Sequence, residues 1–363
     1  MTTEFRERLK RLRKKLSSAH ADALIVTYPA NIYYLSGFTG SSGALVVEHG
    51  KATLFTDGRY ALQAPAQTAS AGVRPQITKE SLPAAVGGYL GSLRKRVMAA
   101  YDPSRVTVAA QSSLEKAAGP KVRWQPETGW TEELRAIKSP AEIAQMRKAA
   151  LLGSRVFEQA LKVVRPGVTE IEVAAEIEYR MRKLGAEGAS FETIVASGRR
   201  SALPHAHPTT KRLKQNELVV LDLGAILGRY CCDMTRTVFL GRAPERVRRW
   251  YRAVLQAQQA ACEALAVGAK AGAPDAAARQ VLAAYGLGRY FIHSTGHGLG
   301  LEVHEEPLLA ARQERRFEAG NVVTIEPGIY VEGMGGIRIE DDVAIHAGRT
   351  EILTNASREL LEL

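Results

Sequence analysis

The chain has 363 residues, of which 45% are hydrophobic and 24% charged, and these ordinary values predict a globular protein large enough for two domains. No run of roughly eighteen apolar residues occurs, which excludes a membrane-spanning helix. The charged start "MTTEFRERLKRLRKKL" lacks the apolar stretch of a signal peptide, so we expect a cytoplasmic protein with no membrane partner.

The net charge of +11 comes from 49 basic and 38 acidic residues, with basic clusters at 6–15 and 246–252. Apolar residues interrupt both clusters, as on the solvated face of a helix, so the sequence predicts no nucleic-acid partner. Cys231 and Cys232 are adjacent and would form a strained ring if bridged, which predicts reduced thiols.

The first third of the chain predicts a small α/β domain, because strands and helices alternate. An amphipathic helix is expected over residues 4–17. Strands are then predicted at 21–27, 43–49 and 51–57, helices at 60–69 and 81–96, and short strands up to about Trp124.

A sharp helix start at "KSPAEIAQMRKAA" opens the second part of the chain. Ser139 can cap this helix, Pro140 suits its first position, and Glu142 completes a capping box. The helix should run to about Val164, and a second should cover about 170–184. We place the boundary between 125 and 139, which gives an N-terminal domain over 1–133 and a catalytic domain over 139–363.

From residue 191 the pattern favours strands that pair as hairpins, interrupted by helices at about 244–267 and 274–285. This order is typical of an α+β domain. In the first hairpin, a turn at Leu227–Gly228 would place Asp222 directly opposite Asp233. Like charges at such a short distance are unfavourable, and apolar flanks indicate burial, so a cation between them is expected.

A second hairpin repeats this arrangement. A turn centred on Gly333 would place Glu326 opposite Glu340. Four carboxylates and one histidine suit two divalent ions such as manganese, cobalt, iron or zinc. Because such ions lower the pKa of bound water, the set predicts a hydrolytic site.

The stretch "GHGLGLEVHEEP" at 296–307 holds two histidines, His297 and His304, among three glycines that argue against a helix. The zinc-helix pattern H-E-x-x-H is absent. By themselves these histidines could be hydrogen-bonded loop residues. Glu305 and Glu306 are interpreted as ordinary carboxylates without a direct role, one of which could support a ligand or cap the backbone.

These motifs together resemble the pita-bread metallopeptidases. The segments "LDLGAILGRYCCDMTRT", "GHGLGLEVHEEP", "TIEPGIY" and "GIRIED" carry the resemblance over about 139–363, while "NIYYLSGFTGSSG" and "TDGRY" resemble the creatinase-type domain of aminopeptidase P and prolidase. The resemblance implies an α/β creatinase-like N-terminal domain followed by an α+β pita-bread catalytic domain. It also implies five metal ligands: Asp222, Asp233, His297, Glu326 and Glu340.

The resemblance further implies hydrolysis of the bond before proline in small peptides, with two divalent ions, above all Mn²⁺, as cofactors. Glu326 would accept and pass on a proton, and His293 and His304 would donate hydrogen bonds to the charge that develops on the substrate. The proline end would be shaped by His205 and Arg338, and Tyr330 would line the pocket. The glycines of 296–300 would let the backbone pass close to the metals.

Several alternatives remain at this stage. "GFTGSSG" and "TDGRYALQA" favour aminopeptidase P, which trims longer peptides, over prolidase, which cuts Xaa-Pro dipeptides. Methionine aminopeptidase ranks low, because it usually lacks such an N-terminal domain, and creatinase lacks the intact ligand set. A non-catalytic binding protein for RNA or protein is disfavoured, because every expected site position is filled.

Two further expectations follow from the resemblance. A homodimer is expected, because such N-terminal domains often close a neighbour's active site. Arg199 and Arg200 replace small or amide residues of some relatives, so they are expected to affect the outer part of the substrate site.

Overall fold

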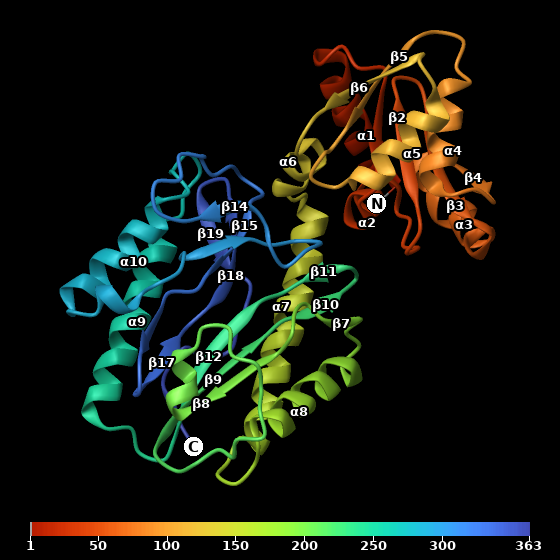
Figure 1. The fold of residues 1–363 in the computed structure, drawn as a ribbon. Helices are drawn as coiled ribbons and strands as arrows, with labels where there is room; N and C mark the ends of the chain where they lie inside the picture. Colours follow the sequence, from red (N-terminus) through yellow and green to blue (C-terminus); the bar gives the residue numbers. More distant parts are fainter. Residues whose placement is uncertain (1) are drawn as a thin grey trace. The chain divides into compact units, whose positions relative to one another are not determined.

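The computed structural model describes residues 2–363 and divides into two compact units, one up to Arg135 and one from Ala136 to Leu363 (Figure 1). None of the helices in this described range combines the length and apolar composition needed to cross a bilayer.

The N-terminal unit is built on a six-stranded sheet in the order β4-β3-β2-β1-β5-β6. The β1–β2 and β2–β3 pairs are antiparallel, whereas β3–β4, β1–β5 and β5–β6 are parallel. All four residues of β1 are buried, as expected for a central strand. The strands are β1 (Ala23–Val26), β2 (Ala44–Glu48), β3 (Ala52–Asp57), β4 (Arg74–Thr78), β5 (Val97–Tyr101) and β6 (Val122–Pro126).

Helices accompany this sheet, and one of them corrects the sequence prediction. The segment before Trp124 was expected to hold only short strands, but α5 forms there because Thr107 caps an alanine-rich run by accepting from the backbone N–H of Ala110. The helices α2 and α6 were also not predicted. The helices are α1 (Thr2–Ser18), α2 (Pro29–Ser36), α3 (Gln63–Thr68), α4 (Leu82–Gly91), α5 (Val108–Ala118) and α6 (Trp130–Ala136).

The C-terminal unit starts with the predicted capped helix. In α7 (Pro140–Ala160), Ser139 and Glu142 form the expected capping box, and this prediction is confirmed. A second capping box, from Thr169 and Glu172, begins α8 (Glu170–Lys183). The other two long helices are α9 (Glu245–Glu263) and α10 (Ala273–Ala284).

Four small sheets make up the strand layers of this unit, in the orders β20-β12-β9-β8, β14-β13-β15-β18-β19, β16-β17 and β11-β10-β7. Their strands are β7 (Gly188–Ala189), β8 (Ile194–Ser197), β9 (Glu217–Leu223), β10 (Ala225–Leu227), β11 (Tyr230–Cys231), β12 (Met234–Leu240), β13 (Gly296–Gly298), β14 (Glu305–Leu309), β15 (Val322–Ile325), β16 (Gly328–Val331), β17 (Gly335–Arg338), β18 (Asp341–His346), β19 (Arg349–Ile352) and β20 (Leu361–Glu362).

Two helix pairs enclose these strands. Helices α7 and α8 share an apolar core with β9–β12, through residues such as Phe157 and Leu221. Helices α9 and α10 share a second core with β15–β18, through residues such as Val254 and Val343. Figure 1 shows the two helix pairs on opposite sides of the strands, so the strands of this unit lie between two apolar cores.

The predicted register of the first hairpin is wrong by two residues. Asp222 faces Thr235, not Asp233, and the turn lies at Gly228–Arg229. Both turn residues have positive φ, 57° and 74°, which is the geometry of a tight two-residue hairpin turn. Because side chains alternate with a period of two, this error leaves both aspartates on the face that was predicted.

The predicted register of the second hairpin is confirmed. Gly328 faces Arg338 across β16–β17, and Ile325 faces Asp341 across β15–β18. Both ladders follow the same register, and Glu326 and Glu340 lie in the gap between them. The hairpin therefore brings these two carboxylates to the junction of two sheets.

Candidate metal centre and substrate cavity

A cavity of about 250 Å³ lies within the C-terminal unit and collects most of the predicted site. The five predicted ligands, together with His205, His304 and Arg338, all line it. Its complete lining is Phe191, Glu192, Ile194, His205, Ala206, His207, Asp222, Asp233, His297, Val303, His304, Glu326, Arg338 and Glu340.

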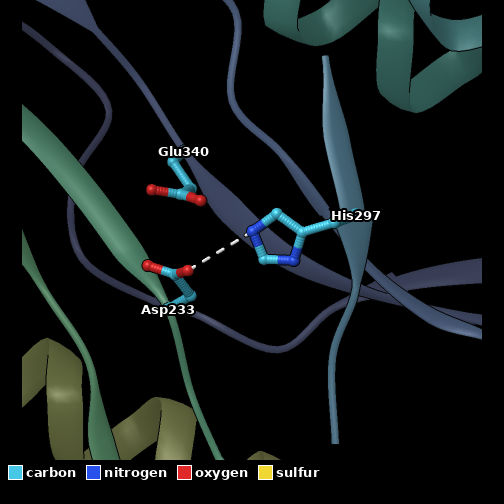
Figure 2. Close-up of side chains that lie close together, drawn as sticks. All are labelled: Asp233, His297 and Glu340. Carbon is cyan, nitrogen blue, oxygen red and sulfur yellow. Dashed lines mark ion pairs between the residues drawn. The ribbon is translucent and has the colours of Figure 1, made fainter. Parts of the chain in front are cut away.

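Three of the predicted ligands converge at one point. Asp233, His297 and Glu340 each offer one ligand atom within 4.8 Å of the others, and all three residues are buried. Figure 2 shows them coming from three separate segments of the chain. Nε2 of His297 lies 3.6 Å from Oδ2 of Asp233 and 3.7 Å from Oε1 of Glu326.

The imidazole of His297 is held in a form suited to a metal. Its Nδ1 donates to the carbonyl of Gly298 over 3.0 Å, so that Nε2 keeps a free lone pair on the carboxylate side. Burial lowers the pKa of His297 to about 4, so the ring is neutral at physiological pH. A neutral ring with one nitrogen fixed by a backbone carbonyl is the usual state of a metal-binding histidine.

The carboxylates have chemistry that fits divalent cations. Burial, and then repulsion from neighbouring carboxylates, raises the pKa of both Asp233 and Glu340 well above its usual range. Asp222 Oδ1 is buried without a hydrogen-bond partner in the described structure. A buried acid is either protonated or balanced by a positive charge, and carboxylate oxygens with one imidazole nitrogen form a donor set for divalent cations.

Glu326 is a predicted ligand whose pKa lies near neutrality. Its side chain is 17% exposed at the cavity, and it follows directly after β15. Burial raises the pKa of Glu326 to about 7, against the opposing effect of the Arg338 guanidinium. A carboxyl group with this pKa can accept and release protons near neutrality.

Arg338 ties the carboxylates to one another. Its Nη2 donates to Asp222 Oδ2 over 2.5 Å, and its Nε donates to Thr235 Oγ1 over 2.9 Å. The Thr235 hydroxyl donates in turn to Glu340 Oε2 over 2.6 Å. Arg338 Nη1 donates to the hydroxyl of Tyr330 over 2.8 Å. One guanidinium therefore orients acids from two hairpins.

His293 and Tyr330 lie behind this group and are not among the residues described as lining the cavity. Nδ1 of His293 donates to Ser294 O over 2.7 Å, so Nε2 accepts from the Tyr330 hydroxyl over 2.9 Å. Both ring nitrogens are thus engaged, which ties His293 to Arg338 through Tyr330. Burial lowers the pKa of His293 to about 4.

His304 and His205 lie on the cavity itself. The ring of His304 packs against that of His297 with centroids 4.4 Å apart. Burial lowers the pKa of His304. His205 is exposed and carries its ring on the segment between β8 and β9. His207 also lines the cavity, and its Nδ1 lies 3.0 Å from Oε2 of Glu192.

The glycines around His297 have a different physical role from the predicted one. A Cβ on Gly296 would lie 2.0 Å from Thr324 O, and one on Gly298 would lie 2.2 Å from Glu306 O. The close approach is therefore to the flanking strands β15 and β14. Glycine lets three strands pack tightly where the histidine emerges.

Sequence reasoning missed several residues that support the site. Thr235 follows Asp233 by two positions and joins Arg338 to Glu340. Asp342 is buried and accepts from the backbone N–H of Asp233 over 3.2 Å. Proximity in sequence to the predicted ligands was the only available signal for both. The apolar lining from Phe191, Ile194 and Val303 had no such signal.

Glu305 forms a buried ion pair near the cavity, and the two adjacent cysteines are protonated. Glu305 Oε2 forms an ion pair with Lys138 over 3.0 Å, with side chains only 5% and 1% exposed. Burial raises the pKa of Cys231 to about 12 and that of Cys232 well above its usual range. Their thiols are therefore protonated and unreactive at neutral pH.

Comparison with known proteins identifies the family. Residues 144–347 match the model of metallopeptidase family M24, and residues 8–137 match the creatinase/prolidase N-terminal domain. A protein named Xaa-Pro dipeptidase from Pyrococcus furiosus is 35% identical over 98% of this chain and 100% of its own length.

Solved structures are similar over nearly the whole chain. A structure titled Xaa-Pro dipeptidase from Bacillus anthracis is 37% identical, with a TM-score of 0.93 over 98% of this chain and 99% of the other. One titled X-Pro aminopeptidase from Thermotoga maritima is 34% identical, with a TM-score of 0.88 over 95% and 98%. The predicted fold class, a creatinase-like α/β domain with an α+β pita-bread domain, is confirmed. The chain belongs to metallopeptidase family M24.

Proposed function

We propose that this chain hydrolyses the peptide bond before proline and releases the N-terminal residue of Xaa-Pro peptides. The observation that carries this proposal is the convergence of Asp233, His297 and Glu340 beside one cavity that Asp222 and Glu326 also line. The names of the relatives, Xaa-Pro dipeptidase and X-Pro aminopeptidase, support the choice of bond. Proline lacks an N–H and fixes φ, so its bonds require a dedicated site.

In this proposal the five ligands hold two divalent ions. Asp222 would use the Oδ1 atom that has no other partner, and His297 would use the lone pair of Nε2. When bound, such ions supply Lewis acidity and lower the pKa of water toward neutrality. Oxygen-rich ligands with one nitrogen favour Mn²⁺, with Co²⁺, Zn²⁺ or Fe²⁺ as alternatives.

The protein's own groups then place the substrate and move the proton. Glu326 accepts a proton from the attacking water and passes it to the leaving proline nitrogen. His304 lines the cavity and can donate to the charge that develops on the scissile carbonyl oxygen. His205 contacts the proline end. His293 acts indirectly, by fixing Tyr330 and thereby Arg338.

We propose the aminopeptidase as the finer assignment. A dipeptide carries a carboxylate directly after proline, and a cation would be its strongest partner. Within the described lining, Arg338 is the only arginine or lysine, and its nitrogens already donate to Asp222, Thr235, Tyr330 and Pro204. This arrangement favours peptides that continue beyond proline. The second candidate is a dipeptidase, which the names of the Pyrococcus and Bacillus relatives favour.

Two substrates of different length test both assignments. Purified protein with added Mn²⁺ should cleave Xaa-Pro-Xaa peptides with a higher kcat/KM than Xaa-Pro dipeptides. A preference for the dipeptide would favour the second candidate. Absence of cleavage of both, in protein with two bound ions per chain, would refute the proposed function.

A further inference from the structure

A carboxylate outside the cavity organises the segment that carries His205. Glu170 is the first residue of α8 and is 0% exposed. Oε1 accepts from the backbone N–H and the hydroxyl of Ser197, over 2.9 and 2.8 Å. Oε2 accepts from Arg200 Nε over 3.0 Å, and from the N–H and hydroxyl of Thr209 over 3.1 and 2.7 Å.

These donors come from the two ends of one loop. Ser197 ends β8, and Thr209 lies past the histidines, so Glu170 joins the beginning and the end of segment 198–209. We call this segment the His205 loop. A single buried carboxylate therefore closes the base of the loop. Charged acceptors form stronger hydrogen bonds than neutral ones, so this closure is firm.

The Arg200 side chain links two positions of the loop. Its Nη2 donates to the carbonyl of His207 over 2.6 Å, while its Nε remains on Glu170. The guanidinium therefore spans the loop from position 200 to position 207. Arg199 beside it is exposed.

The tip of the His205 loop contacts the β16–β17 hairpin. The Ser201 hydroxyl accepts from the backbone N–H of Gly336 over 2.8 Å, and Pro204 O accepts from Arg338 Nη1 over 3.1 Å. His205 follows Pro204 directly. Its position at the cavity thus depends on two attachments, one to β17 and one to Glu170.

We propose that Glu170, together with Arg200, is a positioning residue for catalysis that acts through His205. This inference rests on the proposed function, in which His205 contacts the proline end of the substrate. Among the described residues, the hydrogen bonds of the Glu170 carboxylate go to Ser197, Arg200 and Thr209, none of which lines the cavity or is a predicted ligand.

The kinetic test uses Glu170→Gln. Glutamine keeps the shape but turns an amide N–H₂ toward groups that are themselves donors, so the loop base should loosen. We expect kcat/KM for Xaa-Pro-Xaa to fall roughly tenfold to hundredfold, mainly through KM, because small displacements of positioning groups have effects of this size. Metal content should stay at the wild-type level.

A matched control and a double variant separate positioning from general damage. Glu172→Gln alters the carboxylate of the capping box one half-turn away, which accepts from the backbone N–H and hydroxyl of Thr169, and should leave KM near wild type. In a His205→Ala background, Glu170→Gln should cause little further loss of kcat/KM. If the two losses multiply instead, Glu170 does not act through His205.

Trypsin gives a readout that does not need activity. The loop contains Arg199 and Arg200, so loosening its base should accelerate cleavage there in Glu170→Gln but not in Glu172→Gln. Faster cleavage with no catalysis by the wild-type protein would leave the loop closure standing and refute the proposed function. Unchanged cleavage and unchanged KM in Glu170→Gln, with an active wild type, would overturn the present inference.

Discussion

Arg338 Nη2 and Asp222 Oδ2 lie 2.5 Å apart, between side chains that are only 4% and 9% exposed. The guanidinium thereby takes one oxygen of Asp222 and leaves Oδ1 without a partner among the described residues. The same arginine reaches Glu340 through the hydroxyl of Thr235. One residue of the second hairpin thus sets the orientation of acids from both hairpins.

The first prediction follows from this pair. Arg338→Lys keeps the charge but cannot donate to Asp222, Thr235 and Tyr330 at once, because an ammonium lacks the planar fork. We expect kcat/KM for Xaa-Pro peptides to fall about hundredfold, since the loss corresponds to one or two charged hydrogen bonds of about 1.5–3 kcal/mol each. Steady-state kinetics on metal-loaded protein measures this. Wild-type kinetics in the lysine variant would show that the fork is not required.

The second prediction concerns the ligands. Asp233→Ala and Glu340→Ala each remove a member of the convergent trio, so both should lose bound metal and hydrolytic activity. Elemental analysis of dialysed protein and a peptidase assay provide the measurements. Glu306→Ala is the control, because this 56% exposed carboxylate pairs with Arg315 and does not line the cavity. Full metal content in Asp233→Ala would show that the ligand assignment is wrong.

A third prediction links the ions to stability. Buried carboxylates that repel one another destabilise the fold, and ions that bind only the folded state stabilise it by about 2.7 kcal/mol at a hundred times Kd. Addition of Mn²⁺ to chelator-treated protein should therefore raise Tm by several degrees. The Glu340→Ala protein should respond much less. Equal shifts in both proteins would indicate that Mn²⁺ acts elsewhere.

The buried pair of Lys138 and Glu305 gives the fourth prediction. Lys138→Met removes the cation that Glu305 Oε2 contacts at 3.0 Å in a nearly solvent-free position. Loss of one partner of such a pair costs about 3–5 kcal/mol, which urea unfolding would detect. Lys270→Met is the matched control, because the pair of Lys270 and Glu314 is 51% and 73% exposed and contributes at most about 1 kcal/mol. Equal effects of the two substitutions would contradict the prediction.

The fifth prediction is a pH dependence. The Arg147 guanidinium, through a hydrogen bond and its charge, lowers the pKa of Glu351 to about 2, and burial opposes this. Because the folded-state pKa is depressed, the stabilisation is present above the unfolded pKa of about 4.3 and is lost as pH falls toward 2. Solvent exposure of the Arg147 side chain, 38%, limits it to about 1 kcal/mol or less.

Glu351→Gln tests this dependence. Its Tm should lie below that of wild type at pH 7, and the difference should shrink as pH approaches 3. A difference that stays constant between these values would show that the charge of Glu351 contributes nothing.

Local rules predicted much of this molecule. The capping box of Ser139 and Glu142, and the tight register across Gly333, follow from residues within a few positions of one another. The first hairpin was placed two residues out of register. The pairing keeps one register on both sides of Gly224, so the error lay in placing the turn at Leu227–Gly228 instead of Gly228–Arg229, and hydrophobic alternation cannot detect a shift of two.

The sequence by itself determined the candidate ligands and the face of each strand on which they lie, because both depend on residue type and on a period of two. Only the tertiary structure decided which atoms meet. The bonds from Arg338 to Asp222, from Thr235 to Glu340 and from Glu170 to the His205 loop join residues separated by 27 to 116 positions. Such pairings depend on how layers of strands pack, and no spacing rule along a chain encodes that packing.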